Sequence, residues 1–310
     1  IESCRVSNNV TEAQSSMYAG ASLGSGVYCA SATVSRCVIA GNVGISGNYA
    51  SRGDSYAAGG GAFVGNGGLL ENCLVLNNVA TGVYMYADAF GGGVYAYGSA
   101  EVVNCTIAGN RIHPGQGADN YAGGGLYATY GPVIRNTIVH GNTGGYRGYD
   151  NWYTYNNVTM SYCCTIPGAS GIGNIGADPR LADVAAGNAH LLADSPCIDR
   201  GNGADGAAPS VDFDGNARPL DGNSDGSACA DIGAYEAPAG TTTPNLLMNG
   251  TFENPSAWVV LDDVRGEPWA ARSGTNGLAM YGWTDGGITW QDVPAVGFSI
   301  AASRRNSVDF

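Results

Sequence analysis

The chain alternates apolar and polar residues over short stretches, and Gly or Asn ends each stretch after a few residues. Residues 93–97, GVYAY, and 105–110, CTIAGN, show this alternation clearly. It places neighbouring side chains on opposite faces of a β-strand. No comparable stretch has the 3.6-residue period of an amphipathic helix. The pattern therefore predicts an all-β protein made of many short strands.

These stretches recur at intervals of 27 to 36 residues. One unit of this length cannot bury its apolar face alone, whereas stacked units can. The repeat predicts a single-stranded parallel β-helix over residues 1–175, with a period of about 32 residues and equivalent positions about 4.8 Å apart. The general crossover preference favours a right-handed coil. The aligned anchor residues are Cys4, Cys37, Cys73, Cys105, Thr137 and Cys164.

Two further columns accompany the anchors. An Asn follows five residues after each of the first five anchors, and we expect its amide to bond to the Asn above and below while tolerating a left-handed corner. Upstream, a Gly-x-aromatic column predicts either stacked rings or a stripe that binds sugars. The Asn column is Asn9, Asn42, Asn78, Asn110 and Asn142. The aromatic column is Tyr28, Phe63, Tyr95 and Tyr127.

The nine cysteines divide into two groups. Those of the anchor column are predicted to pack as buried free thiols, because Thr137 replaces Cys there; bridges between adjacent rungs remain an alternative. Cys197 and Cys229 lie outside the repeats in a Gly- and Asp-rich segment. They are the predicted disulfide, which implies an oxidising compartment.

The insertions between Asn and the next Gly corner are rich in Tyr and repeat an Asp-x-aromatic pattern. Carboxylates in register would raise each other's pKa or recruit a cation. Three readings follow: solvated loop residues, a groove for glycans or a cation, or an acid–base pair for a lyase or hydrolase. The catalytic candidates are Asp88, Asp119, Asp150 and Arg147. The ligand-binding candidates are Tyr86, Tyr121, Tyr149, Trp152 and Tyr153.

Composition narrows the function classes. The net charge is −13 and all 13 cationic residues are Arg, so we expect no nucleic-acid partner and no lysine chemistry. No apolar stretch is long enough for a membrane-spanning helix, and no signal peptide is visible. Because residue 1 already lies inside a repeat, we expect the chain to be a fragment of a longer one.

Residues 176–236 change character and are expected to close the end of the solenoid. The Asp-rich motif VDFDGNARPLDGNSD offers oxygen ligands for Ca²⁺, with a salt-bridged turn around Arg218 as the alternative. The candidate Ca²⁺ ligands are Asp212, Asp214, Asp221 and Asp225. We expect no required cofactor, and Ca²⁺ is the one candidate ion.

The motifs DPRL, LADSPCIDRG, DFDGNARP and DIGAYE occur in this order. They resemble the C-terminal part of bacterial choice-of-anchor Q domain proteins. The repeats resemble the coils of those proteins and of the chlamydial polymorphic outer membrane proteins. The resemblance covers about residues 1–237. It implies a right-handed, pectate-lyase-like β-helix on a secreted or cell-surface bacterial protein, without defining a reaction.

Residues 237–244 have the composition of a linker, and residues 245–310 begin a different pattern, NLLMNGTFENPSAW. This stretch resembles the first half of a galactose-binding-like jelly roll. The resemblance implies a partial β-sandwich module that contacts carbohydrate.

Together these patterns predict a monomeric, extracellular or cell-surface protein that binds glycans or partner surfaces. An enzyme, either a polysaccharide lyase or a glycoside hydrolase, is the alternative. A passive stalk without a ligand is the third hypothesis.

Overall fold

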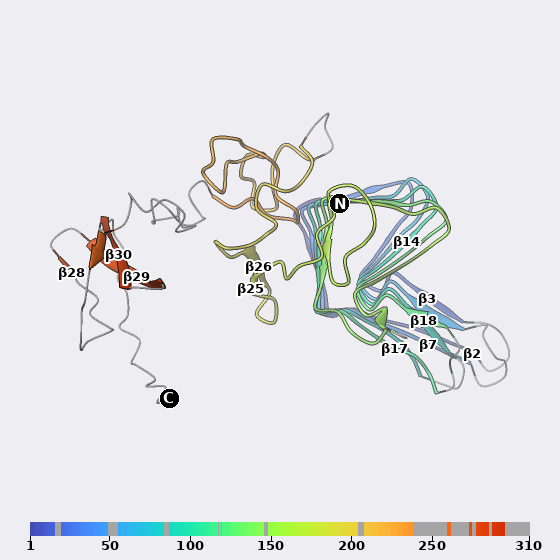
Figure 1. The fold of residues 1–310 in the computed structure, drawn as a ribbon. Coiled ribbons are helices and arrows are strands. Elements are labelled where there is room, and N and C mark those ends of the chain that lie inside the picture. The colour runs from blue at the N-terminus through green and yellow to red at the C-terminus, as the bar shows by residue number, and fades with distance from the viewer. Residues whose placement is uncertain are drawn as a thin grey trace. The chain divides into compact units, whose positions relative to one another are not determined.

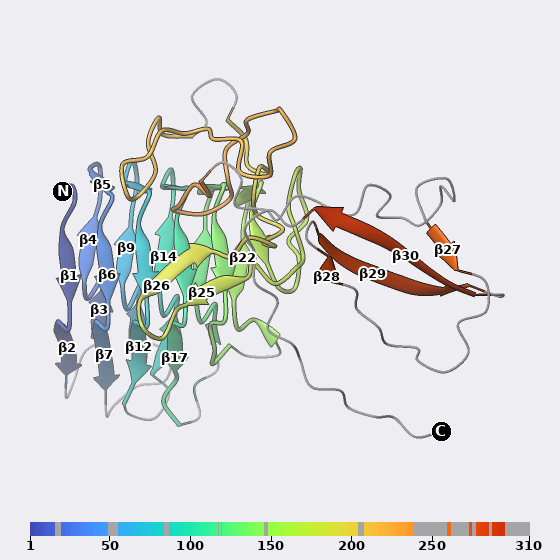
Figure 2. The ribbon, with the colours of Figure 1, turned by 90° about the vertical axis from the view of Figure 1, so that its left-hand side faces the viewer.

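The computed structural model describes residues 1–15, 20–48, 55–83, 87–116, 118, 120–145, 148–203 and 208–238, and the backbone of 259–261, 273–274, 277–284 and 287–294. Every named element in these residues is a β-strand. The chain divides into two units, Ile1–Thr242 and Thr243–Phe310. Figure 1 views the first unit along its stack of strands, and Figure 2 views it from the side.

The first unit is a parallel β-solenoid with five sheets, numbered here in chain order. Sheet 1 contains β1 (Arg5–Ser7), β6 (Val38–Ala40), β11 (Leu74–Leu76), β16 (Thr106–Ala108), β21 (Ile138–His140) and β24 (Cys164–Thr165). Sheet 2 contains β2 (Val10–Ser15), β7 (Val43–Asn48), β12 (Val79–Gly82) and β17 (Arg111–His113). Sheet 3 contains β3 (Ala21–Leu23), β8 (Tyr56–Ala58), β13 (Asp88–Phe90) and β18 (Tyr121–Ala122).

Sheet 4 contains β4 (Val27–Cys29), β9 (Ala62–Val64), β14 (Val94–Tyr97), β19 (Leu126–Thr129) and β22 (Trp152–Tyr155). Sheet 5 contains β5 (Thr33–Ser35), β10 (Leu69–Glu71), β15 (Glu101–Val103), β20 (Val133–Arg135) and β23 (Thr159–Ser161). Each of the first four coils therefore supplies one strand to every sheet. The predicted all-β, parallel β-helical architecture is confirmed.

Within the solenoid, the Asn column forms a continuous hydrogen-bonded ladder. Nδ2 of Asn42 donates to Oδ1 of Asn78 at 2.9 Å, and Nδ2 of Asn78 donates to Oδ1 of Asn110 at 3.0 Å. Each of these oxygens also accepts the backbone N–H of the preceding rung. Asn9 and Asn142 extend the ladder, and Asn151 in the following loop completes it. The ladder satisfies buried polar groups along the whole solenoid.

The left-handed corner lies one residue before the position that the repeat suggested. The residues that precede the ladder asparagines have positive φ, whereas the ladder residues do not. Asn77 (56°) and Gly109 (68°) are examples. The Gly of the aromatic column is needed for a different reason. A Cβ at Gly93 would lie 2.8 Å from Nδ2 of Asn110, a member of the Asn ladder. That corner therefore requires Gly because the amide approaches it closely.

Apart from the exposed Cys4, the cysteines of the anchor column form a stack of buried thiols. The backbone N–H of Cys37 donates to Sγ of Cys73 at 3.4 Å, and that of Cys105 donates to Oγ1 of Thr137 at 3.3 Å. The last member is Cys163, not Cys164 as aligned from the sequence. Cys164 pairs in register with Ile138, one residue past the anchor of the coil before. The last interval is therefore one residue shorter than predicted.

Residues 176–238, called the lateral segment here, do not close the end of the solenoid. They cover the outer face of sheet 1, where Leu74, Leu76 and Ala108 are buried against Ala234 and Tyr235. Figure 2 shows β25 (Leu181–Asp183) and β26 (Asn188–Leu191) running across several coils. The physical reason is visible in the strands: LVL and TIA are buried on both faces, so sheet 1 needs a cover on its outside.

Asparagines at one corner of the solenoid hold the lateral segment. The asparagines that directly precede three of the anchors donate side-chain N–H bonds to backbone carbonyls of the lateral segment. Asn72 bonds to Val211 at 2.7 Å, and Asn136 bonds to Asn202 at 2.9 Å. Asn104 bonds to Asp231 and Gly233, both at 3.3 Å. The lateral segment and the solenoid are therefore one packed body.

The predicted Cys197–Cys229 disulfide is not formed in this structure, in which all nine cysteines lie in described residues and are reduced. Cys197 is fully buried where the lateral segment packs on sheet 1, in a cluster with Cys164, Ile138 and Ile232. Cys229 lies nearer the surface, where its thiol donates to the carbonyl of Gly201 at 3.0 Å. The two sulfurs do not pair because they occupy different environments of the same segment.

The described strands of the second unit form an antiparallel sheet in the order β27 (Val259–Leu261), β30 (Gly287–Pro294), β29 (Gly277–Thr284) and β28 (Ser273–Gly274). The galactose-binding-like module over residues 245–310 stays a prediction.

Candidate functional site

The outer face of sheet 4 carries a ladder of stacked aromatic rings. Tyr28 and Phe63 stack with centroids 4.8 Å apart and planes 4° apart. Tyr95 continues from Phe63 at 5.4 Å, Tyr127 from Tyr95 at 5.1 Å, and Tyr153 from Tyr127 at 5.4 Å. The rings stack because their strands pair in register, so equivalent side chains repeat at the strand spacing. We call these five residues the aromatic ladder.

The inner rings of the ladder have little free surface for a ligand. Each of them is covered on both faces by its neighbours, and Phe90 packs beside Tyr127 at a centroid distance of 4.9 Å. Burial raises the pKa of Tyr127 to about 12, and it also raises the pKa of Tyr95. Both phenols therefore remain protonated at neutral pH. The aromatic ladder therefore stabilises sheet 4 and supports the side chains beside it.

Beside the ladder lies a second group of rings, Tyr97, Tyr130 and Tyr155, called the exposed tyrosine cluster here. Their exposed fractions are 38%, 57% and 52%. Tyr97 and Tyr130 are 5.5 Å apart and tilted by 59°, and Tyr130 and Tyr155 are 6.4 Å apart at 90°. Since these rings do not stack face to face, each one leaves aromatic surface open to a ligand. The cluster is the best candidate site in the described residues.

Tyr130 occupies a left-handed backbone conformation with φ of 63°. The equivalent position of the coil before is Gly98, which has φ of 65°. A bulky residue in this region costs roughly 1 kcal/mol relative to Gly. Its ring is more than half exposed, so burial in the core does not compensate that cost. A strained, exposed aromatic residue is a candidate for a functional ring.

The sequence contained the signal for this cluster, although it was not used. Tyr97 and Tyr155 each lie two residues after a ladder tyrosine, so the two-residue period of a strand places them on the same outer face. Tyr130 interrupts that period at the corner, and only the structure shows that its ring lies between the other two.

Asp88 and Asp150, the two candidate catalytic carboxylates in the described residues, lie in different surroundings. Asp88 is buried, and its carboxylate accepts the backbone N–H of Asn120 at 3.2 Å. Asp150 accepts the backbone N–H groups of Gly144 and Gly145, both at 2.9 Å. Asp88 is paired in register with Tyr56 on sheet 3, whereas Asp150 lies at the corner before β22. Both carboxylates hold backbone turns; Asp119 and Arg147 lie outside the described residues.

The predicted ligand-binding residues have different surroundings. Trp152 packs against the solenoid core, and its Nε1 donates to the carbonyl of Pro167 at 2.8 Å. Tyr121 is half-buried against a small alanine-rich cluster. Tyr153 is a rung of the aromatic ladder, and the exposed Tyr149 packs edge-on against it at 4.8 Å. Tyr86 lies outside the described residues.

The candidate Ca²⁺ ligands bond to different partners instead of sharing one site. Asp212 is buried and accepts from Asn216, whereas Asp214 pairs with His190 at 2.9 Å. Asp221 caps a surface turn by accepting the backbone N–H groups of Asp225 and Gly226. Within the described ranges, no three His, Cys, Asp or Glu side chains form a group that would hold a metal ion. These bonds explain the motif as local turn geometry.

The Arg of the same motif forms a buried ion pair. Nε of Arg218 lies 2.8 Å from Oε1 of Glu236, and both side chains are almost completely buried. Asp231 and Asp212 lie in the same interior. Burial raises the pKa of Asp231 to about 7 and also raises that of Glu236, for which Arg218 acts in the opposite direction. The motif residues therefore build the interior of the lateral segment.

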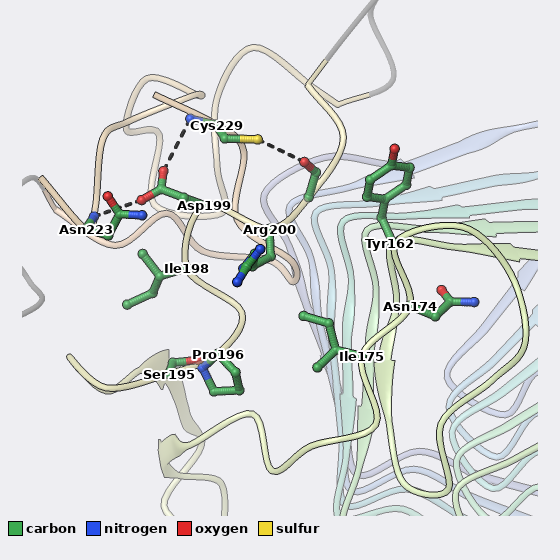
Figure 3. A pocket seen from close by; sticks show the side chains of 12 residues that line it. Tyr162, Asn174, Ile175, Ser195, Pro196, Ile198, Asp199, Arg200, Asn223 and Cys229 are labelled. Atoms are coloured by element: carbon green, nitrogen blue, oxygen red, sulfur yellow. Dashed lines mark hydrogen bonds between the residues drawn. The ribbon is translucent and has the colours of Figure 1, made fainter. Parts of the chain in front are cut away.

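A cavity of about 700 Å³ lies where the lateral segment meets the last coil (Figure 3). Tyr162 and Asn174 line it from the solenoid, and Asp199 and Arg200 line it from the lateral segment. The carboxylate of Asp199 is occupied by backbone N–H groups of Asn223 and Cys229. The cavity walls thus offer few free polar groups in a convergent arrangement.

No protein-family model matches the chain, and no curated protein or solved structure matches it significantly. In the part of the chain that the structure describes, no helix is long and apolar enough to cross a membrane.

Proposed function

We propose that this chain is a carbohydrate-binding β-solenoid of the bacterial cell surface or exterior, and that it holds an extended, uncharged polysaccharide on the exposed tyrosine cluster. One observation carries the proposal: Tyr97, Tyr130 and Tyr155 expose unstacked rings in a row that follows the coils. Aromatic rings of this kind offer an apolar face and a hydroxyl group that donates and accepts hydrogen bonds. Pyranose rings have the matching combination of apolar C–H faces and polar edges.

The shape of the surface favours an extended ligand. The three tyrosines come from successive coils and contact one another in sequence, so a chain that follows the solenoid axis meets them in turn. The aromatic ladder beside them fixes the strands in register. A row of weak contacts then adds up along one polymer, as in other multivalent binding.

Charge favours a neutral ligand over an acidic one. The five strands of sheet 4 contain no Asp, Glu, Arg or Lys. The whole chain carries a net charge of −13, which repels uronic acid polymers at low ionic strength. We therefore expect retention by neutral glucans, xylans or mannans and weak or no retention by polygalacturonate.

Affinity electrophoresis in gels that contain soluble xyloglucan, arabinoxylan, galactomannan or polygalacturonate measures this binding directly. Tyr130→Ala is expected to weaken binding about fivefold, because a ring contact contributes about 1 kcal/mol. The triple variant Tyr97→Ala/Tyr130→Ala/Tyr155→Ala is expected to migrate as if no polysaccharide were present.

Tyr28→Ala is the matched control. It removes a tyrosine of similar exposure, 60%, from the other end of the same sheet and is expected to leave retention unchanged. Circular dichroism and thermal unfolding verify that each variant is folded. If the folded triple variant is retained as strongly as the wild-type chain on every polymer, the proposal is wrong.

A further inference from the structure

Two buried cysteines meet where the lateral segment contacts the solenoid. Cys164 lies in β24, the last strand of sheet 1, and Cys197 lies in the turns of the lateral segment. Both are fully buried in one cluster with Ile138 and Ile232. Their contact therefore crosses the boundary between the solenoid and the segment that covers it.

Strand geometry leaves Cys164 only one partner of this kind. Neighbouring residues of a strand point to opposite faces, so Cys163 faces the solenoid core while Cys164 faces the lateral segment. Cys229 lies outside this cluster and nearer the surface. Cys164 and Cys197 are thus set apart from the other buried thiols.

The anchor-column cysteines are poorly placed for bridges. Cys37, Cys73 and Cys105 repeat in register at about 4.8 Å along the solenoid. This separation exceeds the usual Cβ–Cβ distance of about 3.5–4.5 Å in a disulfide. Each of these sulfurs also accepts a backbone N–H bond, a role that the hydroxyl of Thr137 performs equally well.

We propose that Cys164 and Cys197 form a disulfide that fastens the lateral segment to the end of sheet 1. The bond links residues that are 33 positions apart and closes a loop that includes β25 and β26. Most of the lateral segment has no regular strands, so its attachment depends on side-chain contacts. A covalent link at this boundary restrains its detachment and unfolding.

The ionisation of the two thiols is matched to thiol–disulfide exchange. The hydrogen bond from Cys197 lowers the pKa of Cys164, and the same bond together with burial raises the pKa of Cys197. Within the docked pair, Cys164 is therefore the thiol that ionises first. Exchange takes place as the lateral segment docks, before both sulfurs are enclosed.

The reaction balances with an external disulfide, such as glutathione disulfide. The thiolate of Cys164 attacks one sulfur of this disulfide and releases one glutathione thiolate. Cys197 loses its proton and attacks the Cys164 sulfur of the mixed disulfide, which releases the second glutathione. The two cysteines are oxidised by two electrons, and the two glutathiones carry away the two protons.

Peptide mapping of the full chain tests the link. The protein is unfolded and refolded with and without glutathione disulfide, its free thiols are alkylated under denaturing conditions, and trypsin cleaves after Arg147, Arg180 and Arg200. The link joins peptides 148–180 and 181–200, with a loss of two hydrogens and two fewer alkylated thiols than the nine in the sequence. We also expect the reductant to lower the Tm of the oxidised protein by about 5–10 °C.

Fragment-ion masses of the linked peptides distinguish Cys164 from the adjacent Cys163, and two variants identify the other end of the bond. Cys197→Ala is expected to abolish both the linked peptides and the effect of reductant on Tm, whereas the control Cys229→Ala retains both. Nine alkylated thiols after oxidation, or a link between Cys197 and Cys229, would overturn the proposal. Since none of these measurements involves a polysaccharide, their outcome is independent of the proposed binding function.

Discussion

Replacing Asn78 by Ala is expected to lower the free energy of unfolding of the solenoid by about 4 kcal/mol. Its Oδ1 accepts the backbone and side-chain N–H groups of Asn42, and its Nδ2 donates to Asn110 and to the carbonyl of Ile39. Alanine leaves several of these buried groups without partners, at about 1–3 kcal/mol each. Chemical denaturation followed by circular dichroism measures the loss.

The neighbouring substitution Asn77→Gly is the matched control. Asn77 has the left-handed φ that Gly adopts without strain, and its side chain makes one long, exposed bond of 3.4 Å to Val184. We expect a change within about 0.5 kcal/mol. Equal destabilisation by the two substitutions would contradict the specific role of the ladder amides.

The second large effect concerns pH: the first unit is expected to be more stable at pH 5 than at pH 8. Burial raises the pKa of Asp231 from 3.8 to about 7, and it raises the pKa of Glu236 in the same direction. The folded state therefore binds a proton that the unfolded state has released. The stability that this bound proton contributes to the folded state is fully present below about pH 4 and is lost as the pH rises through 7.

Each pKa unit corresponds to about 1.4 kcal/mol, so Asp231 alone contributes about 3 kcal/mol between pH 5 and pH 8. For a unit of this size we expect the Tm to fall by about 5–10 °C over the same interval. Thermal unfolding at several pH values and constant ionic strength measures the slope. General repulsion at high net charge acts in the same direction, so a variant is needed to isolate Asp231.

Asp231→Asn isolates this contribution because an amide does not ionise in this range. The variant should be less stable at pH 5, since Oδ1 and Oδ2 of Asp231 accept backbone N–H groups of Asp199 and Ala237, and its pH slope should be flatter. Asp225→Asn, at an exposed turn, serves as the control and should keep the wild-type slope. An unchanged slope in Asp231→Asn would assign the pH dependence to other groups.

The repeat predicted much of the solenoid because each column of equivalent residues satisfies one physical requirement of the fold. An Asn every coil satisfies buried amides, a Gly makes room for that Asn, and an apolar residue two positions after each of the first five anchors fills the core. Such periodic requirements appear in the sequence itself. They predicted the parallel β-solenoid and the positions of both ladders, although the last anchor was displaced from Cys163 to Cys164.

The candidate site was less accessible from sequence. The Asp-x-aromatic pattern suggested a column of carboxylates, but Asp88 aligns with Tyr56 and Asp150 binds its own loop. Insertions of unequal length shift the register between coils, so equal spacing from an anchor does not place two residues side by side. The same effect concealed Tyr130, whose position between Tyr97 and Tyr155 depends on a single left-handed corner.

The sequence by itself determined the stacking of coils, since alternation and repetition are local properties that every coil expresses separately. Only the tertiary structure decided where the lateral segment lies. Residues 176–238 contain no repeat, and their attachment to the outer face of sheet 1 depends on non-local contacts such as those of Asn72 with Val211 and Asn136 with Asn202. Pairings between residues so distant along the chain leave no period to read, so the meeting of Cys164 with Cys197 became visible only in three dimensions.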